Sequence, residues 1–196
     1  MDLGLAGAVA VVTGGANGIG RAIASGFCSE QAIVAVWDLA ESVVDVAAEL
    51  QRETGAKVIG CRVDITNQNQ LEAARDETER HFGPIRHLVH AAAIGSGKYG
   101  FPFTNLSPED WPRVLEVNIM GMTRVAHTIA PGMTDRGAGT MTFLASVAGQ
   151  IGSQTDPPYS AAKAANINFA QCLAKDLARS GVRVNTVCPG MVKTPL

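Results

Sequence analysis

Short apolar runs alternate along the chain with longer segments in which apolar and polar residues recur at helical spacing. The runs are rich in Val, Ile and Ala, and most are apolar throughout rather than at every second residue. Continuous apolarity predicts strands covered on both faces, as in a parallel sheet. The predicted strands are Ala8–Thr13, Ile33–Asp38, Lys57–Val63, His87–Ala91, Thr140–Ala145 and Arg183–Cys188.

The segments between these strands predict helices. At one helix start, Ser107 supplies a capping hydroxyl, Pro108 a first-turn proline, and Glu109 and Asp110 two acids. Regular alternation of strand and helix predicts an α/β fold with a Rossmann-type, doubly wound parallel sheet, and ligands at the carboxyl ends of the strands. We expect a single domain over residues 1–196. The predicted helices are Gly18–Glu30, Glu41–Glu53, Asn67–Phe82, Pro108–Thr134 and Pro158–Ser180.

Composition and charge narrow the class of protein. The chain has 196 residues, 46% hydrophobic and 17% charged, which is enough for one domain with a substantial core. A net charge of -2, without a run of Lys or Arg, argues against a nucleic-acid partner. The apolar stretch Leu3–Val12 is too short to span a bilayer, so no membrane partner is expected. The four cysteines lack disulfide or zinc spacing, so we expect reduced thiols, no metal site and a cytoplasmic protein.

A glycine-rich turn follows the first predicted strand. Thr13 leads into Gly14, Gly18 and Gly20, where a helix begins. Glycines let the backbone turn tightly and approach a pyrophosphate, and the helix N-terminus offers free N–H groups to that anion. The spacing differs from GxGxxG, and an ordinary tight connection has the same appearance. No Gly-Lys-Ser/Thr follows the turn, which excludes a P-loop.

An acidic residue at the end of the second predicted strand bears on the choice of cofactor. Asp38 lies 18 residues after Gly20. A carboxylate at this place accepts hydrogen bonds from the adenosine ribose hydroxyls and repels a 2′-phosphate, so it favours NAD over NADP. The alternative interpretation is a solvated cap for the following helix.

Three side chains later in the chain form a candidate catalytic group. Tyr159 and Lys163 lie four residues apart on a predicted helix and so share one face, and Ser146 precedes Tyr159 by thirteen residues. Taken singly, they read equally well as a surface tyrosine, a solvated lysine and a loop serine.

Together these features resemble the short-chain dehydrogenase/reductase family over the whole chain. Thr13–Gly20 matches the TGxxxGxG motif of that family. Asn118, Ser146, Tyr159 and Lys163 match the four members of its catalytic tetrad. The resemblance implies an oxidoreductase that transfers a hydride between NAD(H) and a secondary alcohol or ketone.

The resemblance also implies roles for the tetrad. Tyr159 exchanges the substrate proton, while Ser146 holds the substrate oxygen. Lys163 lowers the pKa of the tyrosine and binds the nicotinamide ribose. Asn118 holds a water that leads the proton to solvent.

The implied cofactor site extends over most of the chain. Asp64 matches the position that holds the adenine amino group, and the segment from Pro189 to Thr194 matches the one that grips the nicotinamide carboxamide. The expected NAD-binding residues are Gly14, Asn17, Gly18, Ile19, Gly20, Asp38, Asp64, Ile65, Ala91, Tyr159, Lys163, Pro189, Gly190, Val192 and Thr194.

Two departures from the family pattern stand out. His90, Ala91, Ala92 and Ala93 replace the usual Asn-Asn-Ala-Gly after the fourth strand, and we expect changed local packing there rather than lost chemistry. Family members usually continue past Leu196 with a substrate-covering loop, further helices and a last strand. The chain is therefore interpreted as either a truncated or a shortened relative.

The sequence leaves the substrate open. Ser96, Lys98 and Tyr99 follow the fourth strand, and Gln150 and Gln154 follow the fifth. If these side chains line the pocket, they favour a polyol or a sugar as substrate. If they are ordinary polar loop residues, they do not indicate any substrate.

Three other functions compete with this interpretation. A 3-oxoacyl-thioester reductase of the same family usually prefers NADP, which Asp38 disfavours. A catalytically silent dinucleotide-binding protein would not need the tetrad, and a Rossmann-like methyltransferase would have no use for Tyr159 and Lys163. The family resemblance further implies a homodimer or homotetramer that pairs through the helices Pro108–Thr134 and Pro158–Ser180.

Overall fold

A single parallel sheet forms the centre of the molecule. The computed structural model describes residues 3–98, 100, 103–152 and 156–194. Within them, six strands lie in the order β3-β2-β1-β4-β5-β6, with every neighbouring pair parallel. The doubly wound α/β fold predicted from the sequence is confirmed. The strands are β1 (Val9–Thr13), β2 (Ile33–Asp38), β3 (Val58–Arg62), β4 (Ile85–His90), β5 (Gly139–Leu144) and β6 (Val182–Val187).

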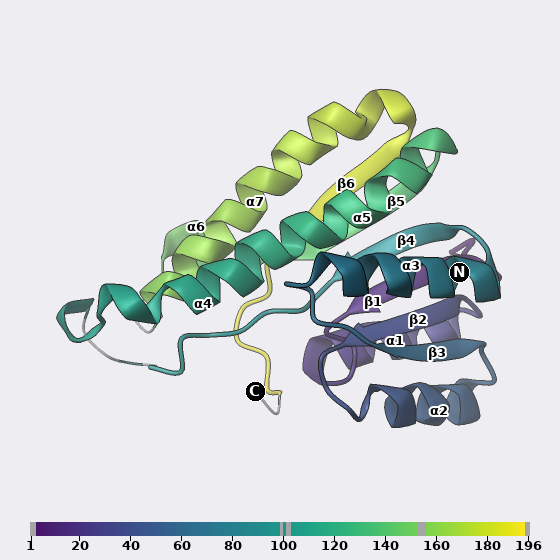
Figure 1. Cartoon of the computed structure of the whole chain (residues 1–196), viewed down its shortest axis with the longest axis horizontal. Coiled ribbons are helices and arrows are strands. Elements are labelled where there is room, and N and C mark those ends of the chain that lie inside the picture. Colours follow the sequence, from purple (N-terminus) through teal and green to yellow (C-terminus); the bar gives the residue numbers. More distant parts are fainter. Residues whose placement is uncertain (1–2, 99, 101–102, 153–155, 195–196) are drawn as a thin grey trace.

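Helices cover both faces of this sheet (Figure 1). On one face, α1 and α2 enclose a core around Val12, Val36 and Leu50. On the other, α3, α5 and α7 enclose a larger core that contains Met141 and Phe143. The helices are α1 (Gly18–Ser29), α2 (Val43–Thr54), α3 (Gln68–Phe82), α4 (Pro112–Leu115), α5 (Met122–Asp135), α6 (Ala148–Ile151) and α7 (Pro157–Leu177), with short 3-10 turns at η1 (Phe103–Asn105), η2 (Pro108–Asp110) and η4 (Ala178–Ser180).

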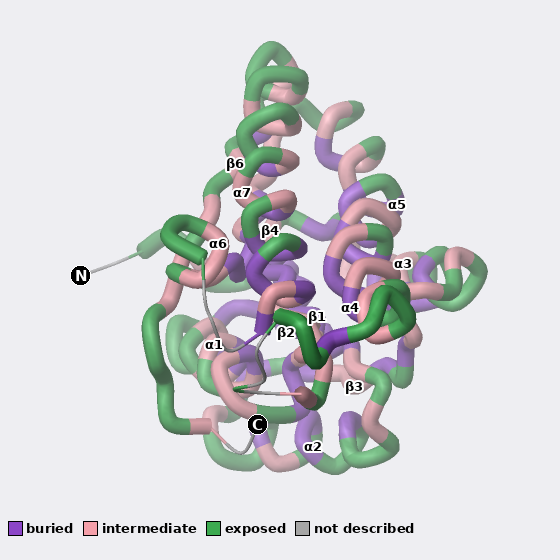
Figure 2. The backbone as a smooth tube through the Cα atoms, turned by 90° about the vertical axis from the view of Figure 1, so that its left-hand side faces the viewer, coloured by how far each residue is buried: buried purple, intermediate pink, exposed green. Residues whose placement is uncertain are grey.

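Burial follows the layers (Figure 2). Strands β1 and β2 are covered on both sides, and Trp37 in β2 is fully buried with its indole nitrogen donating to Thr78 Oγ1 at 3.2 Å. Strand β6 forms one edge of the sheet and is buried only at Val182. The continuous apolar runs of the sequence therefore correspond to the central strands.

The helix predicted over Pro108–Thr134 is present over residues 112–135, but it starts later and is less regular than expected. The segment begins as η2, continues as α4, passes through a π-helical stretch, η3 (Glu116–Gly121), and then becomes α5. Pro112 favours a helix start because it has no N–H to donate to a preceding turn. A π-helical stretch widens one turn and is often found at functional sites. Here it carries Asn118.

The topology brings the predicted functional segments to one edge of the sheet. Because all strands are parallel, the turns that follow β1, β2, β4, β5 and β6 leave the sheet at the same edge. Among the described residues, no helix combines the length and the apolarity needed to cross a membrane.

Candidate active site

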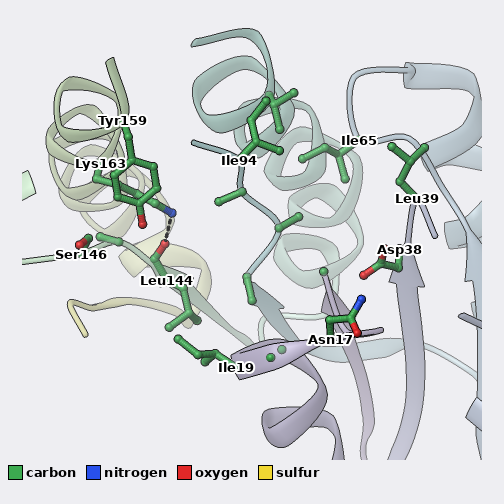
Figure 3. Close-up of a pocket in the computed structure, with 18 of the residues that line it drawn as sticks. Asn17, Ile19, Asp38, Leu39, Ile65, Ile94, Leu144, Ser146, Tyr159 and Lys163 are labelled. Carbon is green, nitrogen blue, oxygen red and sulfur yellow. Dashed lines mark hydrogen bonds between the residues drawn. The ribbon is translucent and has the colours of Figure 1, made fainter. Parts of the chain in front are cut away.

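A cleft of about 330 Å³ opens at the carboxyl edge of the sheet. Figure 3 shows Asn17 and Asp38 on one side of it and Ser146, Tyr159 and Lys163 on the other. The lining contains fourteen of the predicted site residues, which come from segments far apart in the sequence: Gly14, Asn17, Gly18, Ile19, Gly20, Asp38, Asp64, Ile65, Ala91, Ser146, Tyr159, Lys163, Pro189 and Gly190.

The glycine turn has the shape of a phosphate cradle. Gly14 and Gly18 have φ angles of +66° and +52°, which favour glycine. A Cβ on Gly14 would lie 2.7 Å from the Cα of Ala92, and one on Gly20 would collide with the carbonyl oxygen of Gly14. The turn ends at the N-terminus of α1, whose first N–H groups have no helical partner. This cradle fits the pyrophosphate of a dinucleotide.

Asp38 faces this turn from the end of β2. One carboxylate oxygen accepts a hydrogen bond from Ala16 N at 3.0 Å, and the other accepts one from Ala40 N at 2.9 Å. An ionised carboxylate has about four acceptor positions, so these bonds leave capacity for ribose hydroxyls. The side chain therefore both braces the turn and fits the adenosine ribose.

Asp64 and Ile65 line the cleft after β3. Asp64 Oδ1 accepts hydrogen bonds from Thr66 Oγ1 at 2.7 Å and Thr66 N at 2.9 Å. These hydrogen bonds, with the positive charge of Arg113, lower the pKa of the Asp64 carboxyl. A carboxylate at this position is an acceptor for an amino group.

Tyr159, Lys163 and Ser146 converge at the opposite end of the cleft (Figure 3). The ammonium nitrogen of Lys163 lies 5.5 Å from the centroid of the Tyr159 ring and donates to Leu144 O at 2.6 Å. Ser146 Oγ accepts a hydrogen bond from Ala148 N at 3.1 Å, so its own proton is available to a substrate oxygen. The spacing in the sequence thus predicted a real spatial group.

Lys163 is a buried cation. Its residue is 2% exposed, and this desolvation lowers the pKa of its ammonium to about 8. Burial disfavours the charged form of a lysine because water no longer solvates it. The group therefore loses and regains a proton near neutral pH far more readily than a surface lysine does.

Asn118 is held against the segment that follows β4. It is fully buried, its Oδ1 accepts from Ile94 N at 2.9 Å, and its Nδ2 donates to Ile94 O at 2.8 Å. This side chain therefore clamps the segment that follows β4. The backbone carbonyl oxygen of Asn118 accepts a hydrogen bond of 2.9 Å from the side-chain amide nitrogen of Asn166, with that amide in its flipped orientation.

The segment after β6 only partly reaches the cleft. Pro189 and Gly190 line it. Thr194 lies beside the glycine turn, since a Cβ on Gly18 would be 3.4 Å from its side chain. Val192 is 51% exposed and lies outside the lining.

His90 is a packed residue rather than a member of the cleft. It is 1% exposed, its Nδ1 shares a 2.9 Å hydrogen bond with Thr13 Oγ1, and its ring packs against Phe143. Desolvation, with the nearby charge of Lys163, lowers the pKa of the imidazole to about 3. The residue joins the ends of β1 and β4.

The sequence motifs do not mark several of the residues that line the cleft. Leu39, Val63, Arg113, Val117 and Leu144 border the cleft, yet no motif marked them. Leu39, Val63 and Leu144 lie at or near strand ends, and Arg113 and Val117 precede Asn118 by five residues and by one. Of the loop residues whose role the sequence left open, Ser96, Lys98 and Gln150 lie outside the lining, while Tyr99 and Gln154 lie outside the described residues.

Comparison with known proteins gives relatives of similar architecture. L-sorbose reductase from Gluconobacter frateurii, solved with NADPH and L-sorbose, superposes with a TM-score of 0.92 at 31% identity, covering 100% of this chain and 73% of that one. NAD+-bound xylitol dehydrogenase superposes with a TM-score of 0.89 at 29% identity, covering 95% and 71%. Cis-4-hydroxycyclohexanecarboxylate dehydrogenase from Sinomonas cyclohexanicum is 36% identical over 96% of this chain and 74% of that protein.

The family model for short chain dehydrogenase matches residues 8–196. The match covers the glycine turn, the convergent Tyr159, Lys163 and Ser146, and the parallel sheet that brings them to one cleft. The chain spans about three quarters of the length of the relative from Sinomonas. It belongs to the short-chain dehydrogenase/reductase family of nicotinamide-dependent oxidoreductases that act on alcohols and ketones.

Proposed function

We propose that the protein uses NAD(H) to interconvert a secondary alcohol and a ketone, with Tyr159 as the acid/base. The observation that carries this proposal is the convergence of Tyr159, Lys163 and Ser146 at the end of a cleft whose other end is a glycine cradle. When bound, the nicotinamide supplies or accepts the hydride. The protein's own residues position the alcohol and move its proton.

The proton moves through Tyr159. In the oxidation direction, the phenolate oxygen accepts the hydroxyl proton of the substrate while Ser146 Oγ donates a hydrogen bond to the same substrate oxygen. In reduction, the phenol returns a proton to that oxygen. Positioned acid/base catalysis contributes about 10²–10⁴-fold to such a step.

Lys163 makes the tyrosine a usable base. A free tyrosine has a pKa of about 10, too high for work near neutrality. A positive charge about 5 Å away in an effective dielectric near 20 is worth about 3 kcal/mol, or about two pKa units. The ammonium of Lys163 is anchored on Leu144 O, so this charge lies at a fixed place beside the ring.

The preferred cofactor is NAD. A carboxylate at Asp38, already bonded to Ala16 N and Ala40 N, would oppose a 2′-phosphate with a like charge. Titration of each cofactor by calorimetry tests this preference. Tighter binding of NADP than of NAD would contradict it.

The proposed substrate is a small hydroxylated compound such as a polyol or sugar. Its support comes from relatives named for L-sorbose, xylitol and 5-keto-D-gluconate, the last being the 5-reductase of Escherichia coli at 29% identity. The test is a panel of polyols, sugars and simple secondary alcohols with NAD, followed by the absorbance of reduced nicotinamide. The highest kcat/KM is expected for a polyhydroxylated member.

A thioester reductase is the second candidate. Acetoacetyl-CoA reductase from Paracoccus denitrificans is 33% identical over 96% of this chain. Adding acetoacetyl-CoA with each reduced cofactor to the same panel separates the two. Faster oxidation of NADPH by the thioester than by any ketose would establish this alternative.

The protein is proposed to act as a homodimer or homotetramer that pairs through α5 and α7. Ala161 and Ala164 are exposed on α7, and Met120, just before α5, is 43% exposed. Small side chains permit close approach of a second helix. Light scattering at micromolar concentration tests the assembly, and a monomer alone would contradict it.

A further inference from the structure

Asp156 stands immediately before the helix that carries Tyr159, and its side chain joins two parts of the chain. The residue is 3% exposed. Oδ1 accepts a hydrogen bond from Tyr159 N at 3.3 Å, which caps α7. Oδ2 accepts one from Ser96 N at 2.8 Å, sixty residues earlier in the sequence. Each oxygen of one buried carboxylate thus holds a different segment.

The segment that contains Ser96 follows β4 and borders the cleft through Ile94. We call residues 94–98 the β4 strap. Its alternate residues are fixed to three different elements: Ile94 to Asn118 in η3, Ser96 to Asp156 at the start of α7, and Lys98 Nζ to Asp110 Oδ2 in η2 at 2.8 Å.

The hydrogen bond from Ser96 to Asp156 connects the strap to the end of the cleft that holds Tyr159. Its acceptor, Asp156, also receives the backbone N–H of Tyr159 itself. A shift of the strap therefore acts on the first turn of α7, where the phenol is attached. The outer anchor is more exposed, with 42% of the Lys98 side chain accessible to solvent.

We propose that Asp156 is a positioning residue, which ties the β4 strap to the start of α7 and so fixes where the Tyr159 hydroxyl lies relative to the substrate. This rests on the proposed role of Tyr159. The carboxylate is chemically suited because it accepts with both oxygens and donates with neither. An asparagine at this position has one acceptor oxygen and one NH₂ group. The NH₂ group would face the N–H of either Ser96 or Tyr159, which is also a donor.

An ordinary helix cap would explain only half of these contacts. Asn67 caps α3 in the ordinary way, its Oδ1 accepting from Gln70 N at 3.2 Å. Loss of either cap lowers stability. Only loss of Asp156 is expected to move a group at the site of the chemistry, where a displacement of about 1 Å can cost about 10²-fold in rate.

The test compares Asp156→Asn with Asn67→Ala in the full-length protein. At saturating NAD, Asp156→Asn is expected to lower kcat for the best alcohol about tenfold or more, with the dissociation constant for NAD within threefold of the parent. Its pH–kcat profile is expected to shift upward, because the phenol lies less favourably beside Lys163. Asn67→Ala is expected to change kcat by less than twofold.

Amide hydrogen exchange supplies a readout that needs no turnover. Residues 92–98 are expected to exchange faster in Asp156→Asn than in the parent, and at the parental rate in Asn67→Ala. If the parent oxidises no alcohol, the proposed function fails while the exchange result still tests the strap. Asp156→Ser, which keeps a capping hydroxyl and lacks the second oxygen, replaces the amide variant if that one does not fold.

Three results would overturn the proposal. The first is a kcat for Asp156→Asn no lower than that of Asn67→Ala. The second is unchanged exchange over residues 92–98. The third is a loss of NAD affinity larger than the loss of kcat, which would assign Asp156 to the cofactor cradle instead.

Discussion

We propose that the two halves of the sheet serve cofactor binding and proton transfer by different means. The half formed by β1, β2 and β3 offers a cofactor a backbone turn with Gly14 and Gly18 at positive φ and the first N–H groups of α1, beside the carboxylates of Asp38 and Asp64. The half formed by β4, β5 and β6 presents side chains held by buried contacts. Asn118 holds Ile94, Asp156 holds Ser96, and Leu144 O holds Lys163.

This difference follows from what each half must do. A pyrophosphate is a large anion that several N–H groups can share, so a tightly turned backbone suffices. Proton transfer needs particular oxygen and nitrogen atoms within hydrogen-bond reach, so side chains must be fixed individually. We therefore expect substitutions in the first half to change binding and those in the second to change turnover.

Lys163→Ala should cause the largest loss of kcat/KM. It is also the one substitution expected to reduce both turnover and NAD binding. It removes the charge beside Tyr159 and the group expected to hold the nicotinamide ribose. We expect kcat/KM to fall about 10³-fold or more, with weaker NAD binding as well. Steady-state kinetics and calorimetry measure the two losses. The exposed Lys175→Ala on α7 is the control, and should change neither.

Gly14→Ala should weaken NAD binding about 10–100-fold with little change in kcat at saturation. The added Cβ meets the backbone of Ala92 at 2.7 Å and imposes a positive φ on a non-glycine residue. Gly55→Ala is the matched control, because Gly55 has a φ of +73° with open space around it. Equal losses of NAD affinity in the two variants would show that strain alone, and not the cradle, is responsible.

The same division separates what the sequence could predict from what it could not. The glycine turn, Asp38 and the central strands are local features whose residue types and order carry the information. The clamp of Asn118 on Ile94 and the bond of Asp156 to Ser96 join residues 24 and 60 positions apart. Such contacts depend on how η3 and α7 pack, and no local pattern encodes that packing.

The π-helical stretch within the predicted helix illustrates the same limit. Helical periodicity over Pro108–Thr134 is real, but the π-helical turn at Glu116–Gly121 shifts the register within it. Tertiary contacts compensate for that irregular turn, notably the two bonds between Asn118 and Ile94. Periodicity alone reports the average helix and misses a single widened turn.

Asp38→Asn should erase or reverse the preference for NAD. The ratio of NAD to NADP affinity should change by about tenfold, a smaller effect than those above. The amide removes the like charge that opposes a 2′-phosphate and keeps one acceptor for the turn. Calorimetric titration of NAD and NADP gives the ratio of affinities. Asp45→Asn on α2 removes the same charge at an exposed position and should leave the ratio unchanged.

His90 lies at the junction of the two halves, and it should make the free energy of unfolding fall at low pH. Its folded-state pKa of about 3 lies below the ordinary value of 6.5, so the unfolded chain binds the proton more readily. Stability is therefore lost as pH falls through 6.5 toward 3, by about 2 kcal/mol at pH 5. In denaturant titrations from pH 7 to pH 5, His90→Asn should show a shallower loss than the parent. The exposed His81→Asn should match the parent, and a parental slope in His90→Asn would contradict this assignment.

Tyr159 is proposed to exchange the substrate proton. Tyr159→Phe keeps the ring beside Lys163 and removes the hydroxyl, so the decisive measurement is kcat with the best alcohol at saturating NAD, together with the dissociation constant for NAD. We expect kcat to fall by about 10²–10⁴-fold while NAD affinity stays within about twofold. A Phe variant with near-parental turnover would show that another group carries the proton.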